Sequence, residues 1–192
     1  HRAKSRSLRT VGRIHVLLGY ERDWWSGADL SEYDFAIESV HYLRAGGEYL
    51  GVDHTRPILE DGIQRLFGGD PYALCREYFR TVCESIRGTS AQVLGHIELV
   101  MKFNEARDLF DDADPRYLSP ALECAELAAK SGKLIEINTG AVARGYRTAP
   151  YPGEAMLRHI ARCGGRVMLA SDCHDARYLD CGFSDASELA KA

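Results

Sequence analysis

The 192-residue sequence lacks any apolar run near the roughly 20 residues that a membrane-spanning helix needs. It also lacks a Cys-x-x-Cys motif. Its six cysteines are widely spaced, as is typical of reduced thiols in a cytoplasmic protein. An excess of positive charge is missing as well, and the net charge of −4 gives no reason to expect nucleic acid or an anionic membrane as a partner. These absences favour a cytoplasmic protein with neither nucleic acid nor a membrane as its partner.

What the sequence does contain suits one globular domain. Hydrophobic residues make up 45% and charged residues 27% of the chain, and no repeat or linker divides it. We therefore expect residues 1–192 to form a single domain. There is no initiator Met, and the chain stops inside a helix-like segment over 184–192. Both features lead us to expect a fragment of a longer protein, whose oligomeric state the sequence does not indicate.

Five short apolar runs are typical of buried strands, and a residue able to coordinate a metal or hydrogen-bond a ligand follows each of them. The runs cover residues 14–19, 35–40, 92–95, 134–137 and 166–170, and the residues concerned are Glu21, His41, His96, Asn138 and Asp172. Amphipathic segments over 56–67 and 72–87, and further segments opened by Ser119-Pro120 and by Pro152, predict helices between the strands. Alternating strands and helices favour an α/β fold with parallel βα units.

The count of strands indicates that the fold is incomplete. A closed parallel barrel needs about eight strands, and its active site lies where the carboxyl ends of the strands meet. Five strands therefore predict an incomplete TIM-like barrel that lacks at least its first βα unit. The shared face predicts that one cluster contains Glu21, His41, His96, Asp172 and His174.

The pair Asp172 and His174 is the most specific local signal, because residues two apart on a strand point to the same side. A carboxylate oxygen beside an imidazole nitrogen suits Zn, Mn or Fe. Arg144 follows the strand over 134–137, and a guanidinium in such a loop can bind phosphate, although a solvated loop arginine is an equally good interpretation.

Four motifs resemble, in order, the later motifs of the PHP (polymerase and histidinol phosphatase) superfamily. They are Gly19-Tyr-Glu21, Asp34-Phe-Ala-Ile-Glu-Ser-Val-His41, Gly95-His-Ile-Glu98 and Ser171-Asp-Cys-His174. The run Leu134-Ile-Glu-Ile-Asn-Thr139, followed by Tyr151-Pro152, narrows the resemblance to the histidinol-phosphatase branch. The resemblance implies a distorted (β/α)7 barrel, here a PHP-type metallophosphoesterase domain over 1–192, with two or three divalent transition-metal ions.

Carried over residue by residue, the resemblance implies a role for each motif residue. Glu21 corresponds to the carboxylate that bridges two metals, and His41 and His96 to ligands of a shared second metal. Asp172 corresponds to a ligand of the first metal and His174 to a ligand of the third. Glu21, Asp172 and His174 are thereby also implied in catalysis. The family's first motif, His-x-His, has no counterpart in this sequence.

The resemblance implies a hydrolase, most specifically a histidinol-phosphatase that converts L-histidinol phosphate into L-histidinol and phosphate in histidine biosynthesis. Arg144 is the expected substrate-binding residue. Two alternatives stay open. One is another PHP phosphoesterase that acts on nucleotides or phosphoproteins. The other is an inactive fragment, because the first motif is absent.

Overall fold

The structure, a computed structural model, describes residues 10–11 and 14–191. Its centre is a five-stranded, all-parallel sheet with the order β3-β4-β7-β8-β9. The strands are β3 (Gly19–Asp23), β4 (Phe35–Ser39), β7 (Val93–Leu94), β8 (Leu134–Asn138) and β9 (Arg166–Ala170). The predicted α/β class with parallel strands is confirmed, and every strand but the first coincides with a predicted run.

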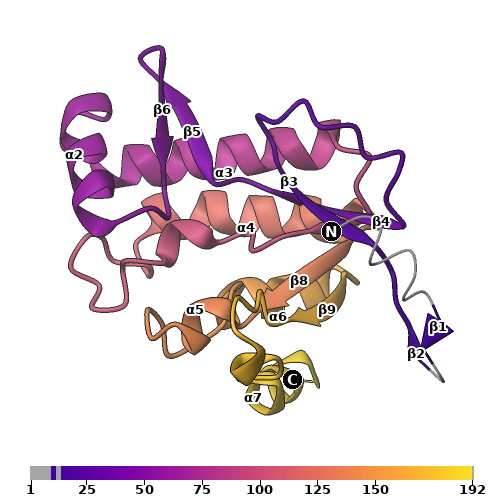
Figure 1. The fold of residues 1–192 in the computed structure, drawn as a ribbon. Coiled ribbons are helices and arrows are strands. Elements are labelled where there is room, and N and C mark those ends of the chain that lie inside the picture. The colour runs from indigo at the N-terminus through magenta and orange to yellow at the C-terminus, as the bar shows by residue number, and fades with distance from the viewer. Residues whose placement is uncertain (1–9, 12–13, 192) are drawn as a thin grey trace.

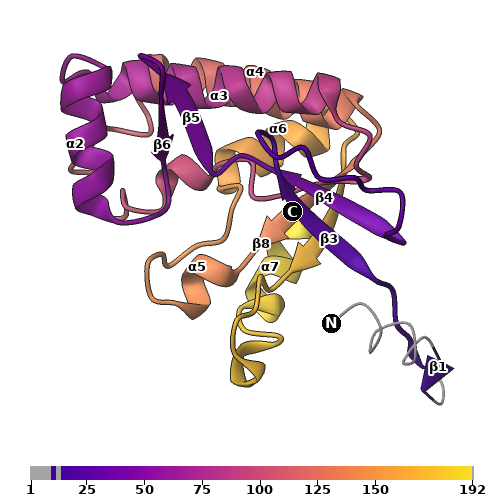
Figure 2. The same ribbon diagram turned by 45° about the horizontal axis from the view of Figure 1, so that its top comes forward.

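Helices connect the later strands and cover the sheet (Figure 1). They are α2 (Arg56–Leu66), α3 (Pro71–Gly88), α4 (Pro115–Lys130), α5 (Gly140–Ala143), α6 (Glu154–Arg162) and α7 (Phe183–Lys191), with short 3-10 turns at Leu99–Met101 and Ala176–Tyr178. Helices α3 and α4 lie side by side above the sheet, and α6 packs next to α4 (Figure 2). None of the helices within the described residues is long and apolar enough to cross a membrane.

Two small hairpins stand outside the main sheet. Strands β1 (Thr10–Val11) and β2 (Ile14–His15) pair with each other, as do β5 (Tyr42–Ala45) and β6 (Glu48–Gly51). The second hairpin projects beside α2 (Figure 1). The predicted first strand over 14–19 is therefore wrong. Its apolar start belongs to a separate hairpin, and the sheet strand begins at Gly19, which places Glu21 inside the strand.

The expected barrel is not confirmed, because the described residues form an open sheet. Strands β3 and β9 are its two edges and do not pair with each other. Five strands are fewer than a parallel barrel needs to close. The coarser prediction of a parallel α/β sheet is confirmed, while the incomplete barrel that the sequence predicts is not confirmed by the described residues.

Two helix starts also differ from the prediction. Helix α4 begins at Pro115 and not at Pro120, because the Asp114 side chain accepts a hydrogen bond from the Arg116 amide (2.8 Å) and caps the earlier turn. Helix α6 begins at Glu154 and not at Pro152. Tyr151 exchanges backbone hydrogen bonds with Asn138 at the end of β8, which keeps this segment extended.

The two faces of the sheet separate the core from the candidate site. Arg22 and Glu38 are directly opposite each other on β3 and β4, and their side chains form an ion pair of 2.5 Å on the helix-covered face. Because side chains alternate along a strand, Glu21 and Asp23 point to the other face. The charge of Glu38 is therefore matched by Arg22.

The buried Asn104 organises the loop between the Leu99–Met101 turn and α4. Its side-chain oxygen accepts hydrogen bonds from the amides of Leu109 (3.1 Å) and Phe110 (3.3 Å), and its Nδ2 donates to the Phe110 carbonyl (2.9 Å). Asn104 itself is 0% exposed. One side chain thus satisfies three backbone groups that would otherwise be unpaired.

We expect Asn104→Ala to lower the free energy of unfolding by about 2–4 kcal/mol, because it leaves buried backbone groups without partners. Urea denaturation measures the change. Asp111→Asn, in the same loop, keeps an oxygen for the Ala113 amide and should change stability by less than about 0.5 kcal/mol. Equal effects of the two variants would contradict the role of Asn104.

Candidate metal site

Three of the sequence-predicted residues meet at the carboxyl end of the sheet. One ligand atom from each of Glu21, His41 and His96 can be chosen so that all three atoms lie within 4.8 Å of one another. The Glu21 Oε1 atom lies 3.1 Å from the Nε2 atom of His96 and 3.6 Å from that of His41. The two imidazole rings stand edge to face, with centroids 4.8 Å apart.

The positions of these residues follow from the strand register. Glu21 is the third residue of β3, His41 follows the end of β4, and His96 follows the end of β7. These three strands are neighbours in the sheet and run in parallel, so their ends share one edge. The side chain of His96 is almost fully buried, at 4% exposed, while those of His41 and Glu21 are 26% and 38% exposed.

A second layer of contacts holds Glu21. The Ser39 hydroxyl donates to Glu21 Oε1 over 2.7 Å. Gly95 makes this arrangement possible, because a Cβ atom there would lie 2.2 Å from the Ser39 oxygen and 2.9 Å from an Ile37 methyl group. Glycine is therefore required next to His96.

The charges in the cluster are strongly coupled. Burial raises the pKa of Glu21, but hydrogen bonding and charge from His96, with smaller contributions from Ser39 and His41, outweigh it and lower that pKa to about 2. Burial lowers the pKa of His96, but the hydrogen bond and charge of Glu21 outweigh it and raise that pKa to about 9. The cluster is thus an ion pair in the absence of other cations.

The donor set fits a divalent transition-metal cation. One carboxylate oxygen from β3 and two imidazole nitrogens from the segments after β4 and β7 converge, and such mixed nitrogen and oxygen donors suit Zn, Mn or Fe. The side chains of His41 and Glu21 are partly exposed to solvent, which leaves access for an ion and a further ligand. The described residues therefore contain a candidate divalent-metal site.

Asp172 and His174 lie next to this cluster but outside the group of three. The charge of Asp172 contributes to the raised pKa of His96, so it faces the same region. His174 contacts Asp172, with Nε2 and Oδ1 separated by 3.2 Å, but its side chain is 76% exposed. Both residues follow the end of β9, and Asp172 has a positive φ of 43°, so strand alternation does not continue through them.

Arg144 binds Asp172 in the structure. Its Nη2 donates to the Asp172 carboxylate (2.9 Å) and its Nη1 to the Asp172 carbonyl (3.0 Å). Gly140 leaves the room for this contact, because a Cβ atom there would lie 2.8 Å from the carboxylate and 2.9 Å from the guanidinium. Arg144 is one-third exposed and faces the predicted site from the end of β8.

Two carboxylates outside the predicted site contact the candidate ligands, and Asp23, which the sequence indicates to be an ordinary loop carboxylate, is instead the last residue of β3. Asp23 accepts a hydrogen bond from the backbone amide of His41 (2.8 Å), and its Oδ2 lies 3.3 Å from the ring Nδ1. Glu136 accepts from the backbone amide of His96 (3.0 Å), and burial raises the pKa of Glu136. The sequence signal for Asp23 was its spacing of two residues from Glu21 on one strand.

Other polar residues near the strand ends have structural partners. His54 contacts the Tyr42 hydroxyl at 2.9 Å, and Lys102 donates to the Asp53 carbonyl at 2.7 Å. Glu98 accepts from the Tyr117 hydroxyl (2.6 Å) and from the Gly153 amide (2.5 Å). These contacts give His54, Lys102 and Glu98 structural roles.

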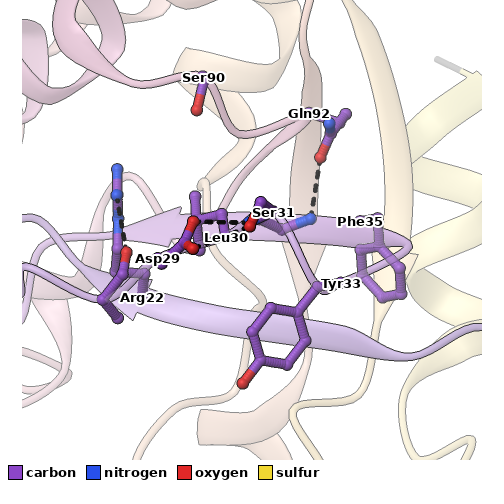
Figure 3. Close-up of a pocket in the computed structure, with 10 residues that line it drawn as sticks. Arg22, Asp29, Leu30, Ser31, Tyr33, Phe35, Ser90 and Gln92 are labelled. Carbon is purple, nitrogen blue, oxygen red and sulfur yellow. Dashed lines mark hydrogen bonds between the residues drawn. The ribbon is translucent and has the colours of Figure 1, made fainter.

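A pocket of about 500 Å³ lies elsewhere, beside the amino end of β4 (Figure 3). Arg22, Asp29, Ser31, Tyr33 and Gln92 are among its lining residues. Arg22 is on the opposite face of β3 from Glu21, and the Gln92 side chain accepts from the Ala36 amide (2.9 Å). The pocket is therefore separate from the candidate metal site.

No family model matches the chain, but its sequence is similar to those of named proteins. A protein named "Probable histidinol-phosphatase" from Deinococcus radiodurans is 30% identical over 184 residues, which cover 92% of this chain and 64% of that protein. The histidinol-phosphatase of Bacillus subtilis is 26% identical over 148 residues, which cover 74% of this chain and 53% of that protein. The chain thus spans between half and two-thirds of the length of these relatives.

Two solved structures have a similar fold. A proposed histidinol phosphatase from Listeria monocytogenes matches 81% of this chain and 58% of its own, with a TM-score of 0.72 and 20% identity. The histidinol phosphate phosphatase of Lactococcus lactis, complexed with Zn, L-histidinol and phosphate, matches 83% of this chain and 56% of its own, with a TM-score of 0.55 and 22% identity. At these identities the likeness shows the fold.

The ion pair between Glu21 and His96 predicts how stability depends on pH without metal. His96 has a raised pKa, so its contribution is complete below about 6.5, the ordinary value for His, and is lost as the pH rises through about 9. Glu21 has a lowered pKa, so its contribution is complete above 4.5 and is lost as the pH falls through about 2.

We therefore expect the free energy of unfolding of the metal-free protein to fall between about pH 6.5 and 9, as measured by urea denaturation with a chelator present. Glu21→Gln should flatten this dependence, because it removes the charge that holds the proton on His96. His159→Ala, in α6, is the matched control and should keep the wild-type slope. The same slope in wild type and Glu21→Gln would contradict the ion pair.

Proposed function

We propose that the protein hydrolyses a phosphate monoester with the help of divalent metal ions, because its sequence is similar to those of proteins named histidinol-phosphatase. The observation that carries the proposal is the convergence of Glu21, His41 and His96 at the carboxyl end of a parallel sheet. L-Histidinol phosphate is the proposed substrate, since relatives bear the name histidinol-phosphatase and one of them was solved with L-histidinol and phosphate. The proposed place of action is histidine biosynthesis in the cytoplasm.

Each site residue has a proposed role. Glu21 would bridge two metal ions, and His41 and His96 would bind one of them. Asp172 and His174 would add ligands for the other ions of a two- or three-metal centre containing Zn, Mn or Fe. When bound, such ions make a water molecule acidic enough to attack phosphorus at neutral pH and offset the charge of the phosphoryl oxygens.

The protein's own groups orient the substrate. Arg144 already uses two guanidinium nitrogens on the oxygens of Asp172, which is the fork geometry that also fits a phosphate. Its position after β8 places it on the same edge of the sheet as His96. Arg144 would bind phosphoryl oxygens, while the partly exposed faces of Glu21 and His41 leave room for the reacting group.

We expect the purified, metal-loaded protein to hydrolyse L-histidinol phosphate faster than a phosphodiester. His96→Ala should lower turnover at least about 100-fold, because a catalytic metal ligand is lost. His159→Ala is a matched control, since His159 is half-buried in α6 and lies 3.8 Å from Glu126. Unchanged turnover in His96→Ala would remove this residue from the site. Faster turnover of a nucleotide or a phosphoprotein would assign another phosphoesterase activity.

A second prediction concerns Arg144. Arg144→Ala should raise KM about tenfold or more and lower kcat by less, because the guanidinium would mainly bind phosphate in the ground state. Steady-state kinetics with L-histidinol phosphate give both constants. Arg158→Ala removes an exposed arginine that pairs with Glu154 and should change neither. A large loss of kcat at constant KM would instead place Arg144 in transition-state stabilisation, and no effect would make it a solvated loop residue.

A further inference from the structure

We propose that Asp23 is a positioning residue of the metal site, which fixes the ring of His41 so that Nε2 carries the lone pair that a cation binds. The inference deepens the proposed function, because it rests on a metal ion at Glu21, His41 and His96. Asp23 acts through His41 and does not itself belong to the group of three ligands.

Both oxygens of Asp23 are engaged, so its carboxylate has one orientation. Oδ1 accepts a hydrogen bond from the Trp25 amide (2.9 Å), and Oδ2 accepts one from the His41 amide (2.8 Å). The same Oδ2 lies 3.3 Å from the ring Nδ1 of His41. Both oxygens thus act as hydrogen-bond acceptors, and Oδ2 also presents an acceptor to the ring of His41.

An accepting oxygen determines the tautomer of the imidazole. The Nδ1 atom of His41 must carry a hydrogen to make a favourable contact with Asp23, and in the neutral ring Nε2 then has the free lone pair. This Nε2 atom faces Glu21 Oε1 at 3.6 Å, on the side where the three candidate ligands converge. A carboxylate behind a metal-binding histidine acts in this way in metalloproteins generally.

The two histidines differ in how much they need such support. The ring of His96 is 4% exposed, so its surroundings fix it, and its Nδ1 has no hydrogen-bond partner among the described residues. The ring of His41 is 26% exposed and lies at the start of the β5–β6 hairpin. Asp23 therefore supplies to His41, through the contact of Oδ2 with the ring Nδ1, the restraint that burial supplies to His96.

The strand register makes this contact a consequence of the fold. Asp23 is paired with Ser39 on the neighbouring strand, two residues before His41. Glu21 and Asp23 point to the same face of β3. One strand thus provides a ligand and, two residues later, the group that orients a ligand from the next strand.

The test is a double-mutant cycle read out by the affinity for Mn²⁺ alone, measured by titration calorimetry on chelator-treated protein. We expect Asp23→Ala to weaken Mn²⁺ binding about 10- to 100-fold. In a His41→Ala background, the same substitution should have almost no further effect, because Asp23 acts through the missing ring. Asp29→Asn, which changes an exposed carboxylate of the loop that follows β3, is the control and should leave the affinity unchanged.

A spectroscopic measurement tests the orientation directly. The ¹⁵N chemical shifts of His41 in the metal-free wild type should report a protonated Nδ1, and Asp23→Ala should shift the ring towards protonated Nε2. Asp23→Asn keeps the shape and one accepting oxygen, so its Mn²⁺ affinity should lie between those of the wild type and Asp23→Ala. This variant keeps the test decisive if Asp23→Ala does not fold.

Three outcomes would overturn the inference. The first is additivity of Asp23→Ala and His41→Ala, which would mean that Asp23 acts on the loop through Trp25. The second is an unchanged tautomer of His41 in Asp23→Ala. The third is unchanged Mn²⁺ affinity in His41→Ala. None of these measurements uses a substrate, so failure of the proposed phosphatase activity would be seen separately in the kinetic assay.

Discussion

The register of three parallel strands is the constraint on which the candidate site depends. Glu21 is opposite Ile37, and Arg22 is opposite Glu38. Because side chains alternate along each strand, Arg22 and Glu38 share one face of the sheet and Glu21 lies on the other. The Arg22–Glu38 pair is covered by helices, while Glu21 and Asp23 reach the carboxyl edge with His41 and His96. A slip of one residue in β3 would exchange these faces and bury the wrong carboxylates. The candidate site therefore forms only when these strands pair in this register.

Carboxylates from neighbouring strands hold both histidines by the backbone. Asp23 on β3 accepts from the His41 amide, and Glu136 on β8 accepts from the His96 amide. The amides follow the ends of β4 and β7, where the sheet ladder no longer provides a partner. Side chains thus satisfy backbone groups that would otherwise be unpaired, and they also set the direction in which each imidazole leaves the chain. Their negative charges add to that of Glu21, which favours a cation at this edge.

Much of the fold could be predicted because its signals are local. The Asp70-Pro71 start and Gly88 end define α3, and the run over 166–170 is β9. The start of β3 could not be found in this way, because the apolar residues from Ile14 begin a separate hairpin and only pairing with β4 selects Gly19. The start of α4 was predicted too late because both Asp114-Pro115 and Ser119-Pro120 are typical helix starts, and the structure uses the first of them. Closure of a barrel depends on contacts between distant strands, which no local pattern contains.

The site could be predicted as far as residues remain on strands or directly after them. Glu21, His41 and His96 come together as expected, because parallel strand ends share an edge whatever the loops do. Alternation along a strand predicts that Asp172 and His174 point to the same side. Both residues instead follow the end of β9, where Asp172 has a positive φ, and the side chain of His174 is exposed. The same rule, applied to Glu21, pairs it with Asp23 inside a regular strand, where alternation is obeyed. A spacing of two residues therefore predicts a shared face only while the backbone remains extended. Glu21 and Asp23 meet this condition, and Asp172 and His174 do not.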